Sequence, residues 1–347
     1  MTRSSLPRQF ERIATDGTDE PGPFMGQHSD TGKTTVATPD LTNVIQTLIE
    51  QESLPDSYAD TVRKVILPLA QHIQSVRQER QRPILVGING AQGTGKSTLT
   101  VFLRSLLSAV YQVPTASFSI DDLYLTRAER EQLAAERHPL LLTRGVPGTH
   151  DLKMGRQLID RLTTAGVDTE TPVPVFDKSR DDRAPQAAWP VFKGRADVVL
   201  MEGWCVGALP EDGDSLITPI NRLEEDEDSD GVWRGYVNQC IKVDYAPFFG
   251  QIDCLIMLEA PSMDCVLTWR TLQEHKLKAK IGDAPHQGDS ADRQPTRLMS
   301  DEQIARFIMH YERITRACLA EMPARADAVI HVDNDHSFSE PLIRQRQ

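Results

Sequence analysis

One glycine-rich stretch constrains this chain more than any other feature. Residues 90–97 read Gly-Ala-Gln-Gly-Thr-Gly-Lys-Ser and match the phosphate-loop pattern G-x-x-x-x-G-K-[ST] at every fixed position. An apolar run over residues 84–88 precedes the loop, and apolar side chains follow it at helical spacing: Leu99, Phe102, Leu103, Leu106, Leu107 and Val110. The stretch therefore predicts a strand, a phosphate-binding loop and the start of a helix.

The residue types in this loop suit the binding of a polyphosphate. Glycines let the backbone adopt conformations closed to other residues, so that successive N–H groups point inward around phosphate oxygens. Lys96 is expected to contact the β and γ phosphates and Ser97 to offer its hydroxyl to Mg²⁺, while the helix N-terminus adds partial positive charge. The expected ligand is a nucleoside triphosphate, and the residues predicted to bind it are Gly90, Ala91, Gln92, Gly93, Thr94, Gly95, Lys96, Ser97 and Thr98.

Length, composition and charge limit the remaining possibilities. A chain of 347 residues, 39% of them hydrophobic and 25% charged, is long enough for one α/β domain of about 250 residues with a decorated N-terminus. The net charge of −12 argues against nucleic acid and against an anionic membrane as partners. Five cysteines without a C-x-x-C spacing fit reduced thiols, and neither a bilayer-spanning run nor a signal peptide is recognisable. We therefore expect a cytoplasmic protein.

The chain divides into three predicted regions. Residues 1–37 are rich in Gly, Pro, Ser, Thr and Asp without periodicity and are predicted to be a disordered tail. Residues 38–82 are predicted to form a helical N-terminal cap, with one helix starting at Thr38-Pro39 and a second after Pro55. Residues 83–347 form the predicted phosphate-loop domain. Its β-rich runs alternate with helices, which predicts an α/β fold with a doubly wound parallel sheet of five strands, at 84–88, 113–120, 197–202, 254–258 and 328–332.

Carboxylates follow two of the predicted strands. Asp121 and Asp122 come directly after the second strand, and Glu202 ends the third. Ligands of open α/β sheets bind at the carboxyl ends of the strands. A carboxylate beside a bound γ-phosphate can accept a proton from an attacking hydroxyl or hold the metal, and we prefer Asp121 to Asp122 for either role. Glu202 is the candidate that positions Mg²⁺ together with Ser97.

Two polar loops are candidates for binding a second substrate. The loop over 144–151 carries Arg144, His150 and Asp151, which suit a hydroxy acid, and Tyr124 lies just beyond the carboxylates. The loop over 173–183 carries Lys178 and Arg183, and we weigh substrate binding equally against a solvated surface loop.

A basic helix and a flexible-looking segment predict a lid. The helix begins at Ser262, carries Arg270 and several lysines, and is followed by a Gly/Asp/Gln/Ser/Pro-rich stretch over 282–296. Arg270 lies nearest the preceding strand and is the residue expected to contact phosphates.

Two further stretches are interpreted as structural. Nine acidic residues lie between Glu211 and Asp230, and we interpret them as a solvated loop. A long helix over 300–322 places Arg306, His310 and Arg313 on a face apart from its apolar stripe, where solvated polar residues are commoner than a substrate cleft.

Taken together, these motifs resemble a known family. Residues 119–124 (Ser-Ile-Asp-Asp-Leu-Tyr), 144–151 (Arg-Gly-Val-Pro-Gly-Thr-His-Asp), 177–179 (Asp-Lys-Ser) and 202–204 (Glu-Gly-Trp) look like the D-glycerate 3-kinase branch of the phosphoribulokinase, uridine kinase and pantothenate kinase superfamily. The helix at Tyr311-Glu312-Arg313 and the acidic Leu223–Asp228 stretch fit the same branch, and the match runs from about residue 83 to about residue 335.

The resemblance implies a P-loop kinase that uses ATP and Mg²⁺ to phosphorylate a hydroxyl of a small molecule. By this resemblance Asp121 aligns with the catalytic acid, Glu202 with the second acidic position and Arg270 with the lid. Plant members carry a glycine-and-arginine-rich stretch where this chain has the shorter Arg180-Asp-Asp-Arg183, which leaves the identity of the acceptor open.

We therefore expect ATP-dependent phosphoryl transfer to a small hydroxylated acceptor, with D-glycerate preferred. Lys178, Arg183 or Arg144 is expected to pair with the acceptor's carboxylate, and Arg270 to stabilise charge on the transferring group. Two alternatives remain: pantothenate, a nucleoside or another sugar acid as acceptor, or a regulatory ATP-binding module that transfers phosphate to nothing. The sequence leaves the oligomeric state open between monomer and dimer.

Overall fold

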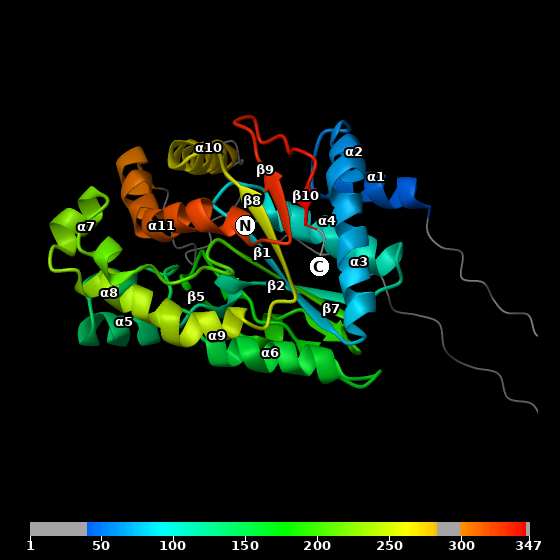
Figure 1. Cartoon of the computed structure of the whole chain (residues 1–347), viewed down its shortest axis with the longest axis horizontal. Helices are drawn as coiled ribbons and strands as arrows, with labels where there is room; N and C mark the ends of the chain where they lie inside the picture. The colour runs from blue at the N-terminus through cyan, green and yellow to red at the C-terminus, as the bar shows by residue number, and fades with distance from the viewer. Residues whose placement is uncertain (1–39, 283–298, 345–347) are drawn as a thin grey trace, which may run out of the picture. The chain divides into compact units, whose positions relative to one another are not determined.

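The predicted strands lie side by side in one mostly parallel sheet. The computed structural model describes residues 40–282 and 299–344, with side chains for all of these except 276–282. Within these residues the main sheet has the strand order β10-β9-β8-β1-β7-β2 (Figure 1). Its parallel strands are β1 (Ile84–Gly90), β2 (Thr115–Ser119), β7 (Val198–Gly203), β8 (Cys254–Glu259) and β9 (Ala328–His331).

A short sixth strand differs from the predicted count of five. Strand β10 (Leu342–Ile343) pairs antiparallel with β9 at one edge of the sheet. A run of two residues is too short to give a periodic sequence signal. The α/β class and the parallel core of the sheet are confirmed.

Alternate residues of the central strands face two separate apolar cores. In β1, Ile84, Val86 and Ile88 belong to one core, whereas Leu85 belongs to the other. Because side chains alternate along a strand, a strand buried on both faces reads as a continuous apolar run, as β1 does. The sheet is therefore covered on both faces, which is the doubly wound arrangement.

Helices from distant parts of the sequence cover each face (Figure 1). The core that contains Ile84 is covered by α1 (Leu41–Gln51), α3 (Leu67–Arg80), α4 (Lys96–Ala109) and α10 (Met263–Gly282). The core that contains Leu85 is covered by α6 (Leu152–Thr164), α8 (Val232–Cys240) and α9 (Ala246–Phe249). Helix α11 (Asp301–Glu321) contributes to both cores, with Ile304 and Ile308 in the first and Tyr311, Ile314 and Cys318 in the second.

The remaining elements are short. Besides single 3₁₀ and π turns, they include the helices α2 (Tyr58–Thr61), α5 (Arg127–Glu136) and α7 (Arg222–Glu227). Two small antiparallel pairs lie outside the main sheet, β3 (Glu170–Pro172) with β6 (Val191–Lys193) and β4 (Phe176–Asp177) with β5 (Asp182–Arg183). The second pair is a hairpin that carries part of the candidate site. Among the described residues, none of the helices combines the length and the apolar character needed to cross a bilayer.

The N-terminal helices pack on the helix that follows the phosphate loop. Helix α1 is capped by Asp40, whose side chain accepts from the N–H of Thr42 (3.1 Å); the predicted start at Thr38-Pro39 lies outside the described residues. Helix α2 continues through a π turn (Val62–Ile66) into α3. Pro68, near the start of α3, has no N–H to donate to the helical hydrogen-bond ladder. The wider π turn that precedes it accommodates this missing hydrogen bond. Tyr58 packs against Phe102 of α4, with ring centroids 5.3 Å apart.

The acidic stretch is solvated only in part, because most of its carboxylates are exposed but two of them are buried. It contains α7 and leads into α8, and both Glu224 and Asp228 are fully buried. Glu224 accepts two hydrogen bonds from Arg313 of α11 (2.8 and 2.6 Å), and Asp228 accepts from the side chain of Arg234 (2.8 Å) and from two backbone N–H groups of α8. A buried carboxylate is tolerated when it is paired and hydrogen-bonded, which a run of charge in the sequence does not reveal.

The predicted lid is described only in part. Helix α10 begins at Met263 and extends to Gly282, but the side chains of its lysines and residues 283–298 lie outside the described residues. The lid function therefore stays a prediction.

Candidate active site

The phosphate loop joins β1 to α4 at the carboxyl edge of the sheet. Gly93 and Gly95 have φ angles of 85° and 86°, in the left-handed region that favours glycine. Thr94 Oγ1 donates to the carbonyl of Ala91 (2.8 Å) and braces the loop from within. Lys96 is the first residue of α4, where backbone N–H groups lack partners within the helix. The left-handed glycines and the helix N-terminus are features of a phosphate-binding loop, and the contacts of this loop with a nucleotide stay a prediction.

Aromatic side chains that sequence analysis did not single out lie against this loop. A Cβ placed on Gly93 would lie 2.7 Å from the Cβ of Trp269 on α10, and one placed on Gly95 would lie 3.2 Å from the ring of Phe338. Trp269 stacks in turn on His336, with ring centroids 4.6 Å apart. Helix α10 and the segment after β9 therefore both contact the phosphate loop. Nothing in the local sequence marks these residues, because they approach the loop only through the fold.

Ser97 and Glu202 meet at the same edge of the sheet. Glu202 lies near the end of β7, in register with Ile88 of β1 and Ser119 of β2. The Ser97 hydroxyl donates to Glu202 Oε1 (3.0 Å). Glu202 is 7% exposed, and its buried Oε2 has no hydrogen-bond partner among the described residues. Leaving such an oxygen unsatisfied is costly, so this atom calls for a cation or a water.

This pair fits a magnesium ion that is shared with phosphates. Mg²⁺ is usually held by one or two protein oxygens, and phosphate oxygens and waters complete its shell. Over residues 40–275 and 299–344, no cluster of three or more His, Cys, Asp or Glu side chains could hold a metal by itself. The hydroxyl of Ser97 and the free oxygen of Glu202 supply the kind of partial shell that a nucleotide-bound Mg²⁺ takes.

Asp121 follows β2, the neighbour of β7, and both of its oxygens are hydrogen-bonded. Oδ1 accepts from the hydroxyl of Tyr124 (2.6 Å), and Oδ2 pairs with the ammonium of Lys178 (2.8 Å). Burial of the Asp121 carboxyl raises its pKa, but the charge of Lys178, the two hydrogen bonds and the charge of Lys96 outweigh burial and lower the pKa to about 2. Asp121 is therefore an ionised carboxylate under the electrostatic influence of the phosphate-loop lysine.

Both carboxylate oxygens of Asp122 accept hydrogen bonds from backbone N–H groups. Its Oδ1 accepts from the N–H of Phe176 (3.1 Å) and its Oδ2 from the N–H of Ser119 (3.3 Å). Burial raises the pKa of Asp122 to about 6, with the neighbouring charge of Asp121 acting in the same direction. These contacts tie the end of β2 to the β4–β5 hairpin and favour Asp121 as the residue available for chemistry.

The β4–β5 hairpin presents Lys178 to Asp121, and a cluster of arginines anchors its turn. The carboxylate of Asp181 pairs with Arg127 (3.2 Å), Arg130 (3.1 Å) and Arg144. The guanidinium of Arg144 also lies over the ring of Phe176, 5.4 Å from its centroid. Arg144, predicted to bind the acceptor, therefore already has a carboxylate partner within the chain.

Three aromatic side chains hold the 144–151 loop by its backbone. Trp204 Nε1 donates to the carbonyl of Gly145 (3.1 Å), and the hydroxyl of Tyr311 donates to the carbonyl of Arg144 (2.9 Å). The hydroxyl of Tyr245 accepts from the N–H of Gly148 (2.9 Å). The sequence shows Trp204 and Tyr311 within motifs, but their partners lie 59 and 167 residues away along the chain.

The other predicted acceptor-binding residues surround Tyr124. His150 is buried, its Nδ1 lies 2.6 Å from the hydroxyl of Tyr245, and its ring packs on Tyr124 with centroids 4.8 Å apart. Burial lowers the pKa of His150 to about 4, so the ring is neutral at pH 7. Arg183 donates to the carbonyl of Tyr124 (3.0 Å), and its buried Nε and the Nε2 of His150 have no described partner. Asp151 caps α6 by accepting from Met154 N–H (2.9 Å).

The described contacts of Arg270 are with residues outside the phosphate loop and the two strand-end carboxylates. Arg270 pairs with Glu274 one turn along α10 (2.9 Å) and lies over the ring of Phe307. No described hydrogen bond or ion pair joins it to Lys96, Asp121 or Glu202, so its role at the phosphates stays a prediction.

Comparison with known proteins places these features in a family. An uncharacterized kinase, mug58, of Schizosaccharomyces pombe is 36% identical over 239 residues, which cover 66% of this chain and 79% of the relative. A chloroplastic D-glycerate 3-kinase of Arabidopsis thaliana is 31% identical over 269 residues, 73% of this chain, although the chain spans only 53% of that relative. No protein-family model matches the chain.

A solved structure agrees with these relatives. D-glycerate 3-kinase from Cryptococcus neoformans var. grubii serotype A is 25% identical, has a TM-score of 0.63, and is matched over 99% of its length by 80% of this chain. The phosphate loop, the parallel sheet and the two strand-end carboxylates define a P-loop kinase, a class that generally uses ATP with Mg²⁺. Within this class, the chain belongs to the D-glycerate 3-kinase-like family of phosphotransferases that act on a hydroxyl group.

Proposed function

We propose that the protein transfers the γ-phosphoryl group of ATP to a hydroxyl of a small hydroxy acid, with D-glycerate as the preferred acceptor. One observation carries the proposal: the ionised carboxylate of Asp121 lies at the sheet edge that holds the phosphate loop and the Ser97–Glu202 pair, with the ammonium of Lys178 beside it. The named D-glycerate 3-kinases among the relatives and solved structures support the choice of acceptor.

In the proposed reaction, the acceptor's hydroxyl oxygen forms a bond to the γ-phosphorus. The bond from that phosphorus to the β–γ bridging oxygen breaks, and its electron pair remains on ADP. Asp121 takes the hydroxyl proton and later loses it to solvent. Lys96 and the loop N–H groups stabilise the phosphates, and Arg270 is proposed to stabilise the transferring group. Ser97 and Glu202 would hold Mg²⁺, with Asp121 as a further candidate ligand, and the bound ion would neutralise phosphate charge.

Cations around Asp121 are proposed to bind the acceptor's carboxylate. Lys178 is 61% exposed and lies 2.8 Å from Asp121, and the buried Nε of Arg183 has no described partner. Arg144 is a weaker candidate because its guanidinium already pairs with Asp181, a carboxylate that it shares with Arg127 and Arg130. Tyr124, His150 and Asp151 form the polar surroundings of the same site, with Asp151 positioning α6 through its cap.

An assay of ADP release over a panel of acceptors tests the proposal. The panel contains D-glycerate, L-glycerate, glycerol, pantothenate and uridine, each with ATP and Mg²⁺. We expect D-glycerate to raise ADP release at least about tenfold above the rate without acceptor and to give the highest kcat/KM of the panel. Stimulation by pantothenate or uridine instead would reassign the acceptor. Absence of stimulation by any compound, despite ATP binding, would favour the regulatory-module alternative.

Replacing Glu202 by Gln is expected to weaken the use of magnesium. The amide can still accept from Ser97 but no longer carries charge for the ion. We expect the Mg²⁺ concentration for half-maximal ADP release to rise about 10–100-fold, with the fold unchanged by circular dichroism. Glu170→Gln, at an exposed position at the start of β3, is the matched control and should behave as the wild type. If the Mg²⁺ dependence of Glu202→Gln were unchanged, the proposal that Glu202 helps to hold Mg²⁺ would be wrong.

The cellular compartment and the binding partners of the protein are also proposals. All five cysteines are free thiols, which supports a reducing compartment such as the cytosol, although one relative is named as chloroplastic. We propose a small-molecule acceptor as the only partner that the reaction requires, with neither nucleic acid nor membrane involved.

A further inference from the structure

Helix α5 contributes one fully buried side chain, and that side chain is a cation. Arg130 is 1% exposed, and it is the only residue of α5 that is buried. A charged group loses its hydration when it is buried, so the burial is costly unless other contacts replace the lost water. The partners of Arg130 therefore indicate why the chain keeps an arginine at this position.

The guanidinium of Arg130 donates to three backbone carbonyls in three different loops. Nε donates to the carbonyl of Leu125 (3.3 Å), Nη1 to that of Leu142 (2.7 Å) and Nη2 to that of Asp181 (2.7 Å). Nη2 also pairs with the carboxylate of Asp181 (3.1 Å), and the guanidinium lies 5.9 Å from the centroid of the Phe176 ring. Each nitrogen of the guanidinium thus holds a different loop.

These three loops form the proposed acceptor site. Each of the three carbonyls lies one to three residues from a side chain that is proposed to surround the acceptor. These neighbours are Tyr124 beside Leu125, Arg144 beside Leu142, and Lys178 and Arg183 on either side of Asp181. Tyr124 in turn donates to Asp121, the proposed base (2.6 Å). The spacing of the carbonyls around Arg130 therefore influences where the acceptor-binding side chains lie.

An arginine supplies geometry here rather than stability. Replacing a buried ion pair by apolar side chains of similar volume is often neutral or stabilising, so a buried cation is weak evidence for a stabilising role. The guanidinium is planar, and its donors point in fixed directions that can hold several acceptors at once. A lysine has the same charge, but its three donors share one nitrogen atom. Only the guanidinium can hold these three carbonyls in their present arrangement.

We propose that Arg130 is a positioning residue of the acceptor site: its guanidinium fixes the spacing of the loops at Leu125, Leu142 and Asp181, and with it the places of the side chains that receive the acceptor. The inference rests on the proposed function and adds a residue that does not itself touch either substrate. Among the described residues, no hydrogen bond or ion pair joins Arg130 to residues 90–98 of the phosphate loop. Use of the acceptor should therefore depend on Arg130, whereas binding of ATP should not.

The test compares Arg130→Lys with the wild type. The charge beside Asp181 remains, but one ammonium cannot hold all three carbonyls. We expect kcat/KM for D-glycerate to fall about 10–100-fold, because a displacement of about 1 Å in a site can cost that much. The KM for ATP should stay within about twofold of the wild type, since the phosphate loop keeps its contacts.

The two enantiomers of glycerate provide a second measurement. D-glycerate and L-glycerate carry the same groups and the same charge, and they differ only in arrangement. The ratio of their kcat/KM values therefore reports on the geometry of the site. We expect this ratio to fall about tenfold in Arg130→Lys, because the loops no longer hold their spacing. A loss of stability alone would lower both values equally and leave the ratio unchanged.

Arg130→Met is the second variant, in case the lysine side chain is poorly tolerated. It removes the charge together with the donors, and Asp181 keeps its ion pairs with Arg127 and Arg144, so no carboxylate is left unpaired. Circular dichroism should show a folded protein. The value of kcat/KM for D-glycerate should fall at least as far as in Arg130→Lys, with an unchanged affinity for ATP by isothermal titration calorimetry.

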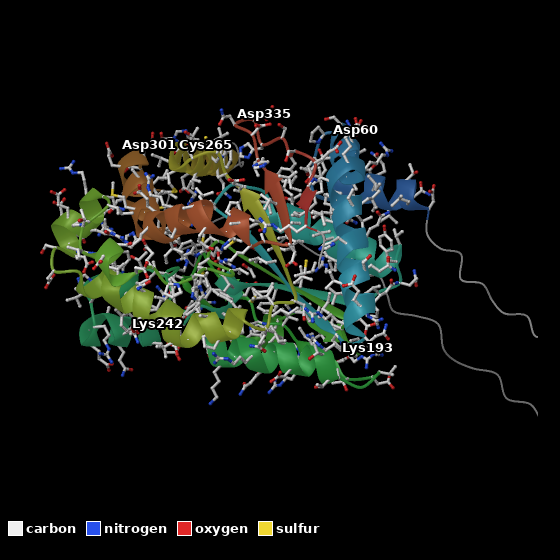
Figure 2. The ribbon with its side chains drawn as sticks, viewed as in Figure 1. Asp60, Lys193, Lys242, Cys265, Asp301 and Asp335 are labelled. Atoms are coloured by element: carbon white, nitrogen blue, oxygen red, sulfur yellow. The ribbon has the colours of Figure 1, made fainter. Side chains whose placement is uncertain are left out.

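A second buried arginine supplies the matched control. Arg234 is 3% exposed, donates to the carbonyls of Leu216 (2.7 Å) and Ile217 (3.3 Å) and pairs with Asp228 (2.8 Å), but none of these partners lies in an acceptor loop. Arg234→Lys should lose a similar free energy of unfolding in urea and keep the kinetic constants of the wild type. Lys193→Gln, at an exposed position labelled in Figure 2, controls for the loss of a surface charge and should match the wild type throughout.

The outcomes separate the role of Arg130 from the proposed function. If D-glycerate stimulates the wild type and both Arg130 variants keep its kcat/KM, the positioning role is wrong and the kinase function stands. The role is also wrong if the constants for acceptor and ATP worsen together, or if neither variant of Arg130 folds while Arg234→Lys does. If another compound of the panel is the acceptor of the wild type, the first measurement is made with that compound and decides in the same way. If no acceptor stimulates the wild type, the proposed function fails and the positioning role with it.

Discussion

Replacing Asp121 by Asn is expected to lower acceptor-dependent ADP formation by about 10²–10⁴-fold, the usual contribution of a positioned general base. The amide is similar in shape and can still accept from Tyr124, but it cannot take the acceptor's proton. ATP binding depends on the phosphate loop, so its affinity, measured by isothermal titration calorimetry, should change little. Near wild-type turnover in Asp121→Asn would refute the assignment of the base.

The neighbouring carboxylate supplies a matched control for this variant. Asp122 holds the N–H groups of Phe176 and Ser119, and an amide oxygen can hold one of them. Asp122→Asn should therefore lose some stability but keep turnover within about tenfold of the wild type. If Asp122→Asn lost turnover and Asp121→Asn did not, the roles of the two residues would be reversed.

Replacing Arg313 by Met is expected to lower the free energy of unfolding by about 3–5 kcal/mol, because it leaves the carboxylate of Glu224 buried without its cation. Glu224 is fully buried, and Arg313 is 8% exposed and also donates to the carbonyls of Ser215 and Thr218. Urea unfolding at pH 7 measures the effect. Met matches the length of the aliphatic stem, so the change reports mainly on the charge and its hydrogen bonds.

Helices α7 and α11, which carry Glu224 and Arg313, also carry an exposed ion pair that serves as a comparison. Arg306 of α11 pairs with Glu227 of α7 at 2.7 Å, with side chains 50% and 42% exposed. Arg306→Met should cost no more than about 1 kcal/mol, because water screens that pair. The double variant Arg313→Met/Glu224→Leu should be more stable than Arg313→Met alone, since no unpaired charge remains. Equal losses from Arg306→Met and Arg313→Met would show that burial of the pair does not matter.

The parts of the fold that were predictable have local signals. The phosphate loop is encoded in eight consecutive residues, and β1 and β7 are buried apolar runs that need no knowledge of their neighbours. The carboxyl ends of parallel strands share one edge, so the position of Asp121 near Glu202 followed once both strands were recognised. The confirmed fold class rests on these same signals.

The parts that were not predictable depend on partners distant in the sequence. Glu224 was interpreted as solvated because its neighbours are acidic, and only Arg313, 89 residues later, explains its burial. Arg144 was predicted to pair with the acceptor's carboxylate, and Asp181 from a different loop already pairs with it. The contact of Lys178 with Asp121 spans 57 residues and cannot be read from either motif alone. Each case is a pairing of charges that spacing along the chain does not specify.

Helix α11 links the two halves of the candidate site mechanically. The first turns of α11 pack with α10 in the core on one face of the sheet. On the other face, the hydroxyl of its Tyr311 donates a hydrogen bond to the carbonyl of Arg144. Glu274 of α10 accepts from the N–H of Met299, just before α11 begins, at 3.0 Å. Packed interiors transmit displacements rather than absorbing them. A displacement of α10 is therefore expected to move α11 and, through the hydrogen bond of Tyr311 to Arg144, the backbone of the 144–151 loop.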